Sequence, residues 1–340
     1  MFLPITGNDA VPLVFNFHGY TSNATEQMWY GDFRPIADTA GFIIVHPEGT
    51  LDNTNMTHFN VGFGGSTVDD VSFSGALLDT LIASYNINAA RVYSTGMSNG
   101  GYMSFYLACQ MSDRIAAIAS ITGSMSPLIY NTCNPQHPTP ILQMHGTADA
   151  TVPYVGNAWS ESIVDVLDYW VNYNNCNPVS SLYSFPDINT GDGSTVDLIK
   201  HDDGDNCSSV VHYKVNGGPH SWPGALFGTT NQDIKGSTEI WNFFRQYDIN
   251  GCIGSVGIDE IEEDALSIYP VPANDYIVVE GYTGSIEDLT LLDLLGKDLR
   301  DVVGIEEGQV SNSVSIDLTL LPDGVYFVKT GNGVHKITKN

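Results

Sequence analysis

The residues best suited to chemistry in this sequence surround Ser98, in the segment Gly96-Met97-Ser98-Asn99-Gly100. A β-rich run, RVYSTG, precedes the serine and a run with helical spacing, GGYMSFYLACQM, follows it, so Ser98 is predicted at a strand-to-helix turn. The pattern G-x-S-x-G is typical of a nucleophile elbow, in which a strained backbone exposes the serine Oγ. The segment therefore indicates nucleophilic attack on a carbonyl carbon, and the helix N-terminus favours the negative charge that develops.

A serine nucleophile needs a base that takes its proton and an acid that orients the base. Asp149 lies in GTADATVPY, directly after the apolar run PILQMHG, and His220 lies in the Gly/Pro-rich loop GGPHSWPG. The chain order Ser, Asp, His is the one that accompanies this kind of elbow. We predict a catalytic triad of Ser98, Asp149 and His220; the alternative for Asp149 is a turn-capping carboxylate. The other histidines after Ser98 are less well placed: His137, His145, His201, His212 and His335.

An oxyanion hole needs two backbone N–H groups aimed at the developing charge. We predict that these come from Asn99, directly after the serine, and from Tyr20, in the loop that follows the apolar run PLVFNF. His18, in the same loop, is expected to hold the loop rather than to carry a proton. No group of residues has zinc-ligand spacing, and the acidic segments DINTGDGST and HDDGDN are interpreted as hairpin turns rather than calcium loops, so no metal and no cofactor are expected.

Two patterns of secondary structure divide the chain. Up to about Ile249, short apolar runs alternate with longer amphipathic ones, which predicts an α/β fold with helices around a mostly parallel sheet. From Ser267 onward, strands follow one another without helices, which predicts a small all-β sandwich. We expect a catalytic α/β domain over residues 1–250, an acidic, Gly-containing linker over 251–264 and the sandwich over 265–340.

Composition narrows the possible partners. The chain has 340 residues, with 12 basic and 39 acidic ones, and a formal net charge of −27. Such a charge argues against nucleic acid or an anionic membrane as partner. No apolar run is long enough to span a membrane. The start, MFLPITGNDAVPLVFNFHGY, does not read as a signal peptide, so we expect that the true N-terminus is missing or that a leader has been removed.

Several motifs of the first pattern resemble one known group of enzymes: LVFNFHGY, GFIIVHPEGT, VDDVSF, STGMSNGGYMSFYLACQMSDRIAAIA, HGTADATVPY and GGPHSWPG. The group is the secreted α/β-hydrolases that include polyhydroxybutyrate depolymerases and feruloyl esterases, similar to the first carbohydrate esterase family. The resemblance covers about Val11 to Tyr247. It implies the α/β-hydrolase fold, the triad named above, and a role for Trp222 in lining the acyl or aromatic pocket; the alternative for Trp222 is loop packing. GGPH in place of the more usual GGGH, and a missing or shortened first strand, depart from the group.

The second pattern has its own resemblance. LSIYPVPANDYIVV, LTLLDLLGK and LPDGVYFVKTGNGVHKITKN resemble the sorting domain of the type IX secretion system of Bacteroidota, over about Ala265 to Asn340. The resemblance implies passage through the outer membrane, with the type IX machinery as partner and a secreted or cell-surface location. The alternative, a carbohydrate-binding sandwich, would have only tyrosines as exposed aromatic candidates.

Secretion permits disulfide bonds among the five cysteines. We predict a bond between Cys176 and Cys207, which would brace the loop of His220. Cys109 with Cys133 is a second, weaker candidate pair, and Cys252 is then the odd thiol in the linker.

The sequence thus predicts a secreted, monomeric serine carboxylic-ester hydrolase. A feruloyl esterase-like activity on plant-polysaccharide or phenolic esters is favoured, because the second domain reads as a sorting signal rather than a polymer-binding module. Two alternatives stay open. One is a depolymerase of polyhydroxybutyrate or another polyester, since the same fold and triad serve all these esters. The other is a non-catalytic surface binding protein built on a hydrolase fold.

Overall fold

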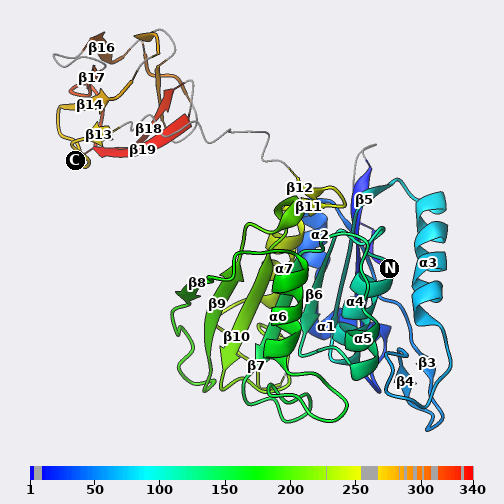
Figure 1. The fold of residues 1–340 in the computed structure, drawn as a ribbon. Coiled ribbons are helices and arrows are strands. Elements are labelled where there is room, and N and C mark those ends of the chain that lie inside the picture. Colours follow the sequence, from blue (N-terminus) through cyan, green and yellow to red (C-terminus); the bar gives the residue numbers. More distant parts are fainter. Residues whose placement is uncertain are drawn as a thin grey trace. The chain divides into compact units, whose positions relative to one another are not determined.

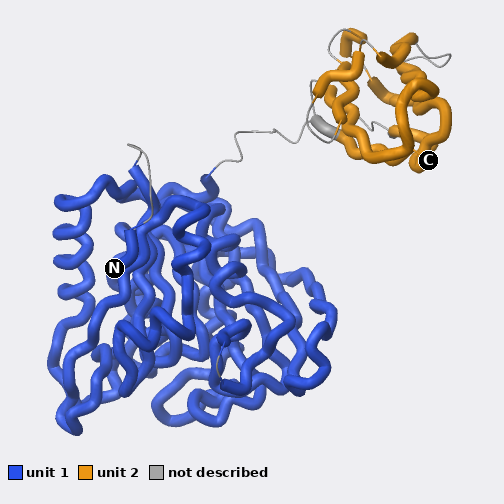
Figure 2. The backbone as a smooth tube through the Cα atoms, turned by 180° about the vertical axis from the view of Figure 1, so that it is seen from behind, with its two compact units in different colours: residues 1–254 blue, residues 255–340 orange. Residues whose placement is uncertain are grey.

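The computed structural model describes residues 1–3, 10–226, 228–253, 267–282, 284–286, 289–293, 297–300, 302–307, 313–330 and 333–339. The chain divides into two compact units, residues 1–254 and 255–340 (Figure 2). Most of the predicted linker, residues 254–264, lies outside the described residues. Its first residues are described, and Gly251–Cys252 (β12) pairs with Tyr247–Asp248 (β11) within unit 1.

Unit 1 is built on one eight-stranded sheet (Figure 1). The first six strands in the order below are parallel neighbours, and the last two are antiparallel. This is the mostly parallel sheet that the sequence predicts. The strand order is β2 (Ile43–Val45), β1 (Val11–Phe17), β5 (Ile87–Met97), β6 (Ala117–Ile121), β7 (Ile141–Gly146), β10 (Val210–Asn216), β9 (Thr195–His201) and β8 (Ser181–Ser184).

The apolar run VPLVFNF forms β1, and all seven of its residues are buried. Parallel strands covered on both faces read as continuous apolar runs, because alternate side chains enter two different cores. Phe15 and Phe17 enter one core and Val14 enters the other. At the edge of the sheet, Phe2 forms an isolated antiparallel bridge with Ile44.

Helices cover both faces of the sheet. On one face, Leu78 of α3, Phe105 of α4 and Trp170 of α6 share a core; on the other, Ala37 of α2 and Phe244 of α7 do so. The helices are α1 (Ala24–Tyr30), α2 (Arg34–Ala40), α3 (Asp70–Ser84), α4 (Asn99–Gln110), α5 (Pro127–Thr132), α6 (Ile163–Tyr173) and α7 (Gly236–Phe244), and the short elements are β3 (Thr50–Leu51), β4 (Thr57–His58) and the 3-10 turn η1 (Asp205–Cys207).

The predicted bond between Cys176 and Cys207 is wrong. Cys207 is bonded to Cys252 instead, because β12 folds back beside η1 rather than beginning a linker. Cys176 is free and buried, with its Sγ 3.7 Å from the carbonyl oxygen of Ser208. Burial raises the pKa of the Cys176 thiol to about 11, so this thiol stays protonated. The second candidate pair, Cys109 with Cys133, is bonded.

Unit 2 is a sandwich of antiparallel strands, as the sequence predicts. Residues of both its sheets, among them Ile277, Ile316 and Val328, share one core. No helix in the described ranges of either unit is long and apolar enough to cross a membrane. One sheet has the order β13 (Ser267–Tyr269), β14 (Tyr276–Glu280), β17 (Ser313–Asp317), β16 (Gly304–Glu307), and the other β15 (Thr290–Leu292), β18 (Gly324–Thr330), β19 (Gly333–Lys339).

Candidate active site

Ser98 occupies the sharp turn between the end of β5 and the start of α4. Its φ of 55° and ψ of −119° are strained for a residue with a side chain. The turn is held by hydrogen bonds: the N–H of Ser98 donates to the carbonyl of Ile121 at 2.8 Å, and the carbonyl of Ser98 accepts from the N–H groups of Gly101 and Tyr102. The side chain of Ser98 lines a surface cavity, so the strained turn presents the hydroxyl to solvent.

The glycines around Ser98 allow this turn to form. A Cβ atom at Gly100 would lie 2.1 Å from the carbonyl oxygen of Phe17, and one at Gly96 would lie 2.6 Å from the same oxygen. Real Cβ contacts are never that short, so β1 and α4 can approach each other only with glycine at both positions. The spacing of the G-x-S-x-G motif is thus explained by the backbone of the neighbouring strand.

Asp149 and His220 follow β7 and β10, which are parallel neighbours. Because the carboxyl ends of parallel strands meet at one edge of the sheet, the two loops lie side by side. Oδ2 of Asp149 lies 2.7 Å from Nδ1 of His220. Oδ1 of Asp149 accepts hydrogen bonds from the N–H groups of Thr151 and Val152, each at 2.8 Å.

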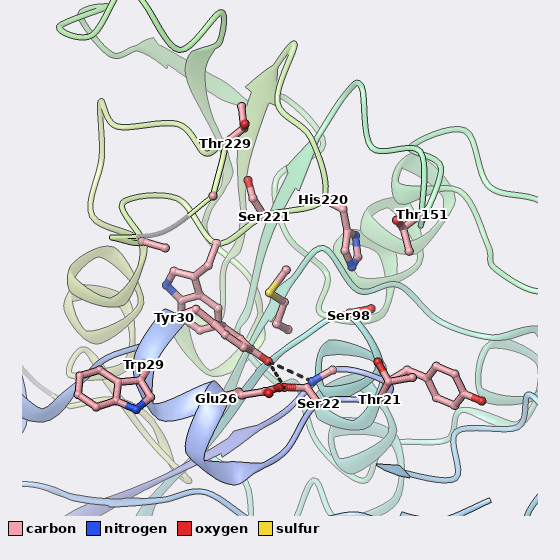
Figure 3. Close-up of a pocket in the computed structure, with 16 residues that line it drawn as sticks. Thr21, Ser22, Glu26, Trp29, Tyr30, Ser98, Thr151, His220, Ser221 and Thr229 are labelled. Carbon is pink, nitrogen blue, oxygen red and sulfur yellow. Dashed lines mark hydrogen bonds between the residues drawn. The ribbon is translucent and has the colours of Figure 1, made fainter. Parts of the chain in front are cut away.

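The environment of Asp149 keeps its carboxylate charged. The residue is 5% exposed, and burial alone would raise its pKa. Hydrogen bonds from His145, His220 and the backbone outweigh this and hold the pKa of Asp149 well below its ordinary value. A charged Asp149 fixes the proton of His220 on Nδ1, which leaves Nε2 free to accept one. Figure 3 shows the imidazole of His220 pointing toward Ser98.

His145 is the residue of this site that the sequence analysis missed. It is fully buried, with Nε2 2.9 Å from the carbonyl of Val152 and 3.3 Å from Oδ2 of Asp149. Its Nδ1 lies 3.0 Å from the amide nitrogen of Gln143, which identifies Nε2 as the protonated nitrogen. The available signal was its position four residues before Asp149, at the end of a buried strand.

The predicted oxyanion donors lie beside Ser98. Neither the N–H of Tyr20 nor that of Asn99 has an acceptor within the described part of the chain. The side-chain amide of Asn99 is used otherwise, since it exchanges two hydrogen bonds with the backbone of Phe59. His18 holds the loop of Tyr20: its Nδ1 donates to the carbonyl of Gly19 and its Nε2 accepts from the N–H of Gly49. Burial lowers the pKa of His18, which favours this neutral form.

Ser98 lies on two cavities rather than one. The first, of about 780 Å³, is also lined by His220 and Trp222 (Figure 3). Trp222 is only 2% exposed and packs edge-to-face on Phe33, so it forms the floor of this cavity and part of the core at once. The second cavity, of about 620 Å³, lies on the Asn99 side of Ser98.

The doubly wound sheet, the strained serine turn and the buried Asp149–His220 pair define unit 1 as an α/β-hydrolase domain. Residues 69–175 match the family model of phospholipases and carboxylesterases, so unit 1 contains a carboxylic ester hydrolase domain. Residues 267–340 match the secretion system C-terminal sorting domain. That match indicates type IX secretion and a location outside the cell or at its surface.

Three relatives show how far the similarity reaches. A bifunctional acetylxylan esterase/xylanase of Neocallimastix patriciarum is 26% identical over 254 residues, 72% of this chain and 32% of that protein. Feruloyl esterase B of Piromyces equi is 31% identical over 153 residues, 44% of this chain and 28% of that protein. Feruloyl esterase D of Neurospora crassa is 26% identical over 219 residues, 64% of this chain and 66% of that protein. The chain thus spans about a third of the length of the first two relatives.

Proposed function

We propose that this chain is a secreted serine esterase in which Ser98 is the nucleophile, His220 the general base and Asp149 the residue that orients it. The observation that carries the proposal is the 2.7 Å contact between Asp149 and His220 at the same cavity as Ser98. The buried charge of Asp149 stabilises the imidazolium that forms when His220 takes a proton.

The reaction proceeds in two halves. Ser98 Oγ attacks the ester carbonyl as its proton passes to Nε2 of His220, and the N–H groups of Tyr20 and Asn99 hold the negatively charged oxygen. The tetrahedral intermediate collapses, the alcohol leaves with the proton from His220, and an acyl group remains on Ser98. His220 then takes a proton from water, which attacks the acyl group and releases the acid and free Ser98.

For the substrate we propose an ester of a plant polysaccharide or of a phenolic acid. The names of the relatives, feruloyl and acetylxylan esterases, support this class. The match of residues 267–340 to a sorting domain also supports it, because that region is then no polymer-binding module for solid polyester.

The test is an assay of the purified full chain on p-nitrophenyl acetate, methyl ferulate, acetylated xylan and a polyhydroxybutyrate film. Wild type should hydrolyse p-nitrophenyl acetate, and Ser98→Ala should lose activity by a factor of about a thousand or more. Ser84→Ala, at the exposed end of α3, is the matched control and should keep full activity. A Ser98→Ala variant that retains more than a tenth of the activity would exclude Ser98 as the nucleophile. Activity on the film alone would instead favour a polyester depolymerase.

A further inference from the structure

The two cavities that meet at Ser98 differ in chemistry, and this difference bears on how an ester is oriented. Three residues line both cavities: Tyr20, Ser98 and Thr151. An ester bound at Ser98 therefore extends into both cavities, with its acyl half in one and its alcohol half in the other. Which half enters which cavity follows from the proposed function, on which this inference rests.

His220 decides the side of the alcohol. It must return its proton to the leaving alcohol oxygen, so this oxygen lies next to the imidazole. His220 lines the first cavity and does not line the second. The alcohol half therefore points into the first cavity and the acyl half into the second.

The first cavity suits a polyhydroxylated alcohol. Hydroxyl groups of Thr21, Ser221 and Thr229 line it, together with the carboxylate of Glu26 (Figure 3). Trp29 also lines it and is 51% exposed, which offers an apolar ring to the face of a sugar. These are hydrogen-bonding and stacking groups of the kind that a saccharide uses.

The second cavity is aromatic. Phe63, Tyr102 and Trp159 line it and come from three different segments of the chain. The ring of Phe63 is edge-to-face with Tyr102 at 4.9 Å and with Trp159 at 5.4 Å. Phe63 and Trp159 are 43% and 42% exposed, so their rings are open to a ligand rather than used up in the core. Aromatic rings in such pairs accept a further planar ring in the same arrangements.

The second cavity also contains an acceptor without a donor. His58 lines it and is 5% exposed. Nδ1 of His58 lies 3.0 Å from the carbonyl of Thr50 and therefore carries the proton, which makes Nε2 an acceptor. This Nε2 is buried and has no partner within the described residues. A hydroxyl group on an aromatic ring bound in the cavity would supply the missing donor.

We propose that the cavity of Phe63, Tyr102 and Trp159 is the acyl subsite, which takes a ring-hydroxylated aromatic acyl group with its hydroxyl donating to His58. The cavity of Glu26 and Trp29 is the alcohol subsite, which takes a saccharide. The substrate class is thus a hydroxylated aromatic acid esterified to a sugar.

The experiment compares subsite variants of the full chain on three esters: p-nitrophenyl acetate, methyl ferulate and ferulate esterified to an arabinose-containing oligosaccharide. Trp159→Ala should lower kcat/KM at least tenfold for both ferulates and at most twofold for the acetate. Trp29→Ala should raise KM for the oligosaccharide ester alone. The reverse pattern, or an equal loss on all three esters, would overturn the assignment of the subsites while leaving the esterase proposal intact. A wild type that hydrolyses none of the three would overturn both.

His58 is tested by the ring hydroxyl itself. Wild type should prefer methyl p-coumarate to methyl cinnamate, which lacks the hydroxyl, by at least tenfold, because an unfilled polar site rejects the analogue. His58→Gln should reduce this preference to less than threefold, and its activity on p-nitrophenyl acetate reports whether the variant has folded. Equal rates of the wild type on the two esters would exclude a hydrogen bond from the ring to His58.

Discussion

Nε2 of His145 lies 3.3 Å from Oδ2 of Asp149, the same oxygen that lies 2.7 Å from Nδ1 of His220. One carboxylate is thus shared by a fully buried imidazole on β7 and a partly exposed one on the loop after β10. The buried contact belongs to the fold, and the exposed contact faces the cavity. Asp149 therefore keeps most of its position and charge when His220 moves, which makes it a fixed support for a base that must exchange protons.

The first prediction concerns the pH dependence of stability. The folded-state pKa of Asp149 lies below its ordinary value of 3.8, so its charge stabilises the fold above about pH 4, and this contribution is lost as the pH falls through the folded pKa. We expect Asp149→Asn to lower Tm at pH 7, and we expect the difference from wild type to shrink below pH 4. Scanning calorimetry across this range measures it. Asp38→Asn, an exposed position on α2, is the control; a Tm difference that is constant with pH would contradict the prediction.

The second prediction concerns the close approach of α4 to β1. Gly100→Ala should destabilise unit 1 by several kcal/mol and abolish activity, since its Cβ would meet the carbonyl of Phe17 at 2.1 Å. Gly75→Ala on α3 is the matched control, because its Cβ would meet nothing closer than 3.7 Å. Alanine there should leave stability unchanged or raise it by about 0.5–1 kcal/mol. Urea unfolding of both variants decides the matter, and equal effects would show that the two helices tolerate bulk alike.

The third prediction concerns the cysteines. Peptide mapping without reduction should find Cys207 linked to Cys252 and Cys109 linked to Cys133, with Cys176 alkylated only after unfolding. Cys252→Ser should lower stability by up to about 4 kcal/mol, as expected for a closed loop with a sequence separation of 45 residues. A Cys176–Cys207 peptide in the map would restore the pairing that the sequence suggested.

The fourth prediction concerns the boundary between the units. Truncation after residue 254 should leave kcat/KM on p-nitrophenyl acetate within about twofold, well under the tenfold that about 1.4 kcal/mol represents, because every proposed active-site residue lies in unit 1. The same truncation in a host with type IX secretion should leave the enzyme in the periplasm. Normal export of the truncated chain, or loss of activity with a native Tm, would contradict the separate role proposed for residues 265–340.

The elements around Ser98 could be predicted because their requirements are local. Gly96, Ser98 and Gly100 are close in sequence, and the turn that they form needs these residue types wherever it occurs. The mostly parallel sheet was likewise evident from its fully buried strands, such as β1. Periodicity and turn chemistry act over a few residues, so a single sequence displays them.

The parts that could not be predicted depend on contacts between distant segments. The acidic, Gly-containing stretch around Cys252 was interpreted as a linker, yet its first residues pair with β11 and bond to η1. Phe63 and Trp159 are nearly a hundred residues apart, and only the folded loops bring their rings together beside Ser98. His145 looked like an ordinary strand residue because its partner is set by the turn that follows it.

The disulfide at the end of unit 1 also has a mechanical consequence. An enzyme held at the cell surface by its C-terminal end is pulled from that end by flow and by its own polymeric substrate. Tension that enters unit 1 at Ile253 reaches Cys252 and crosses the sulfur bridge to Cys207. Residues 208–251, which carry β10, His220 and α7, then form a slack loop outside the loaded path. Pulling on the tether cannot peel the strand before His220 out of the sheet, so the enzyme stays assembled under load.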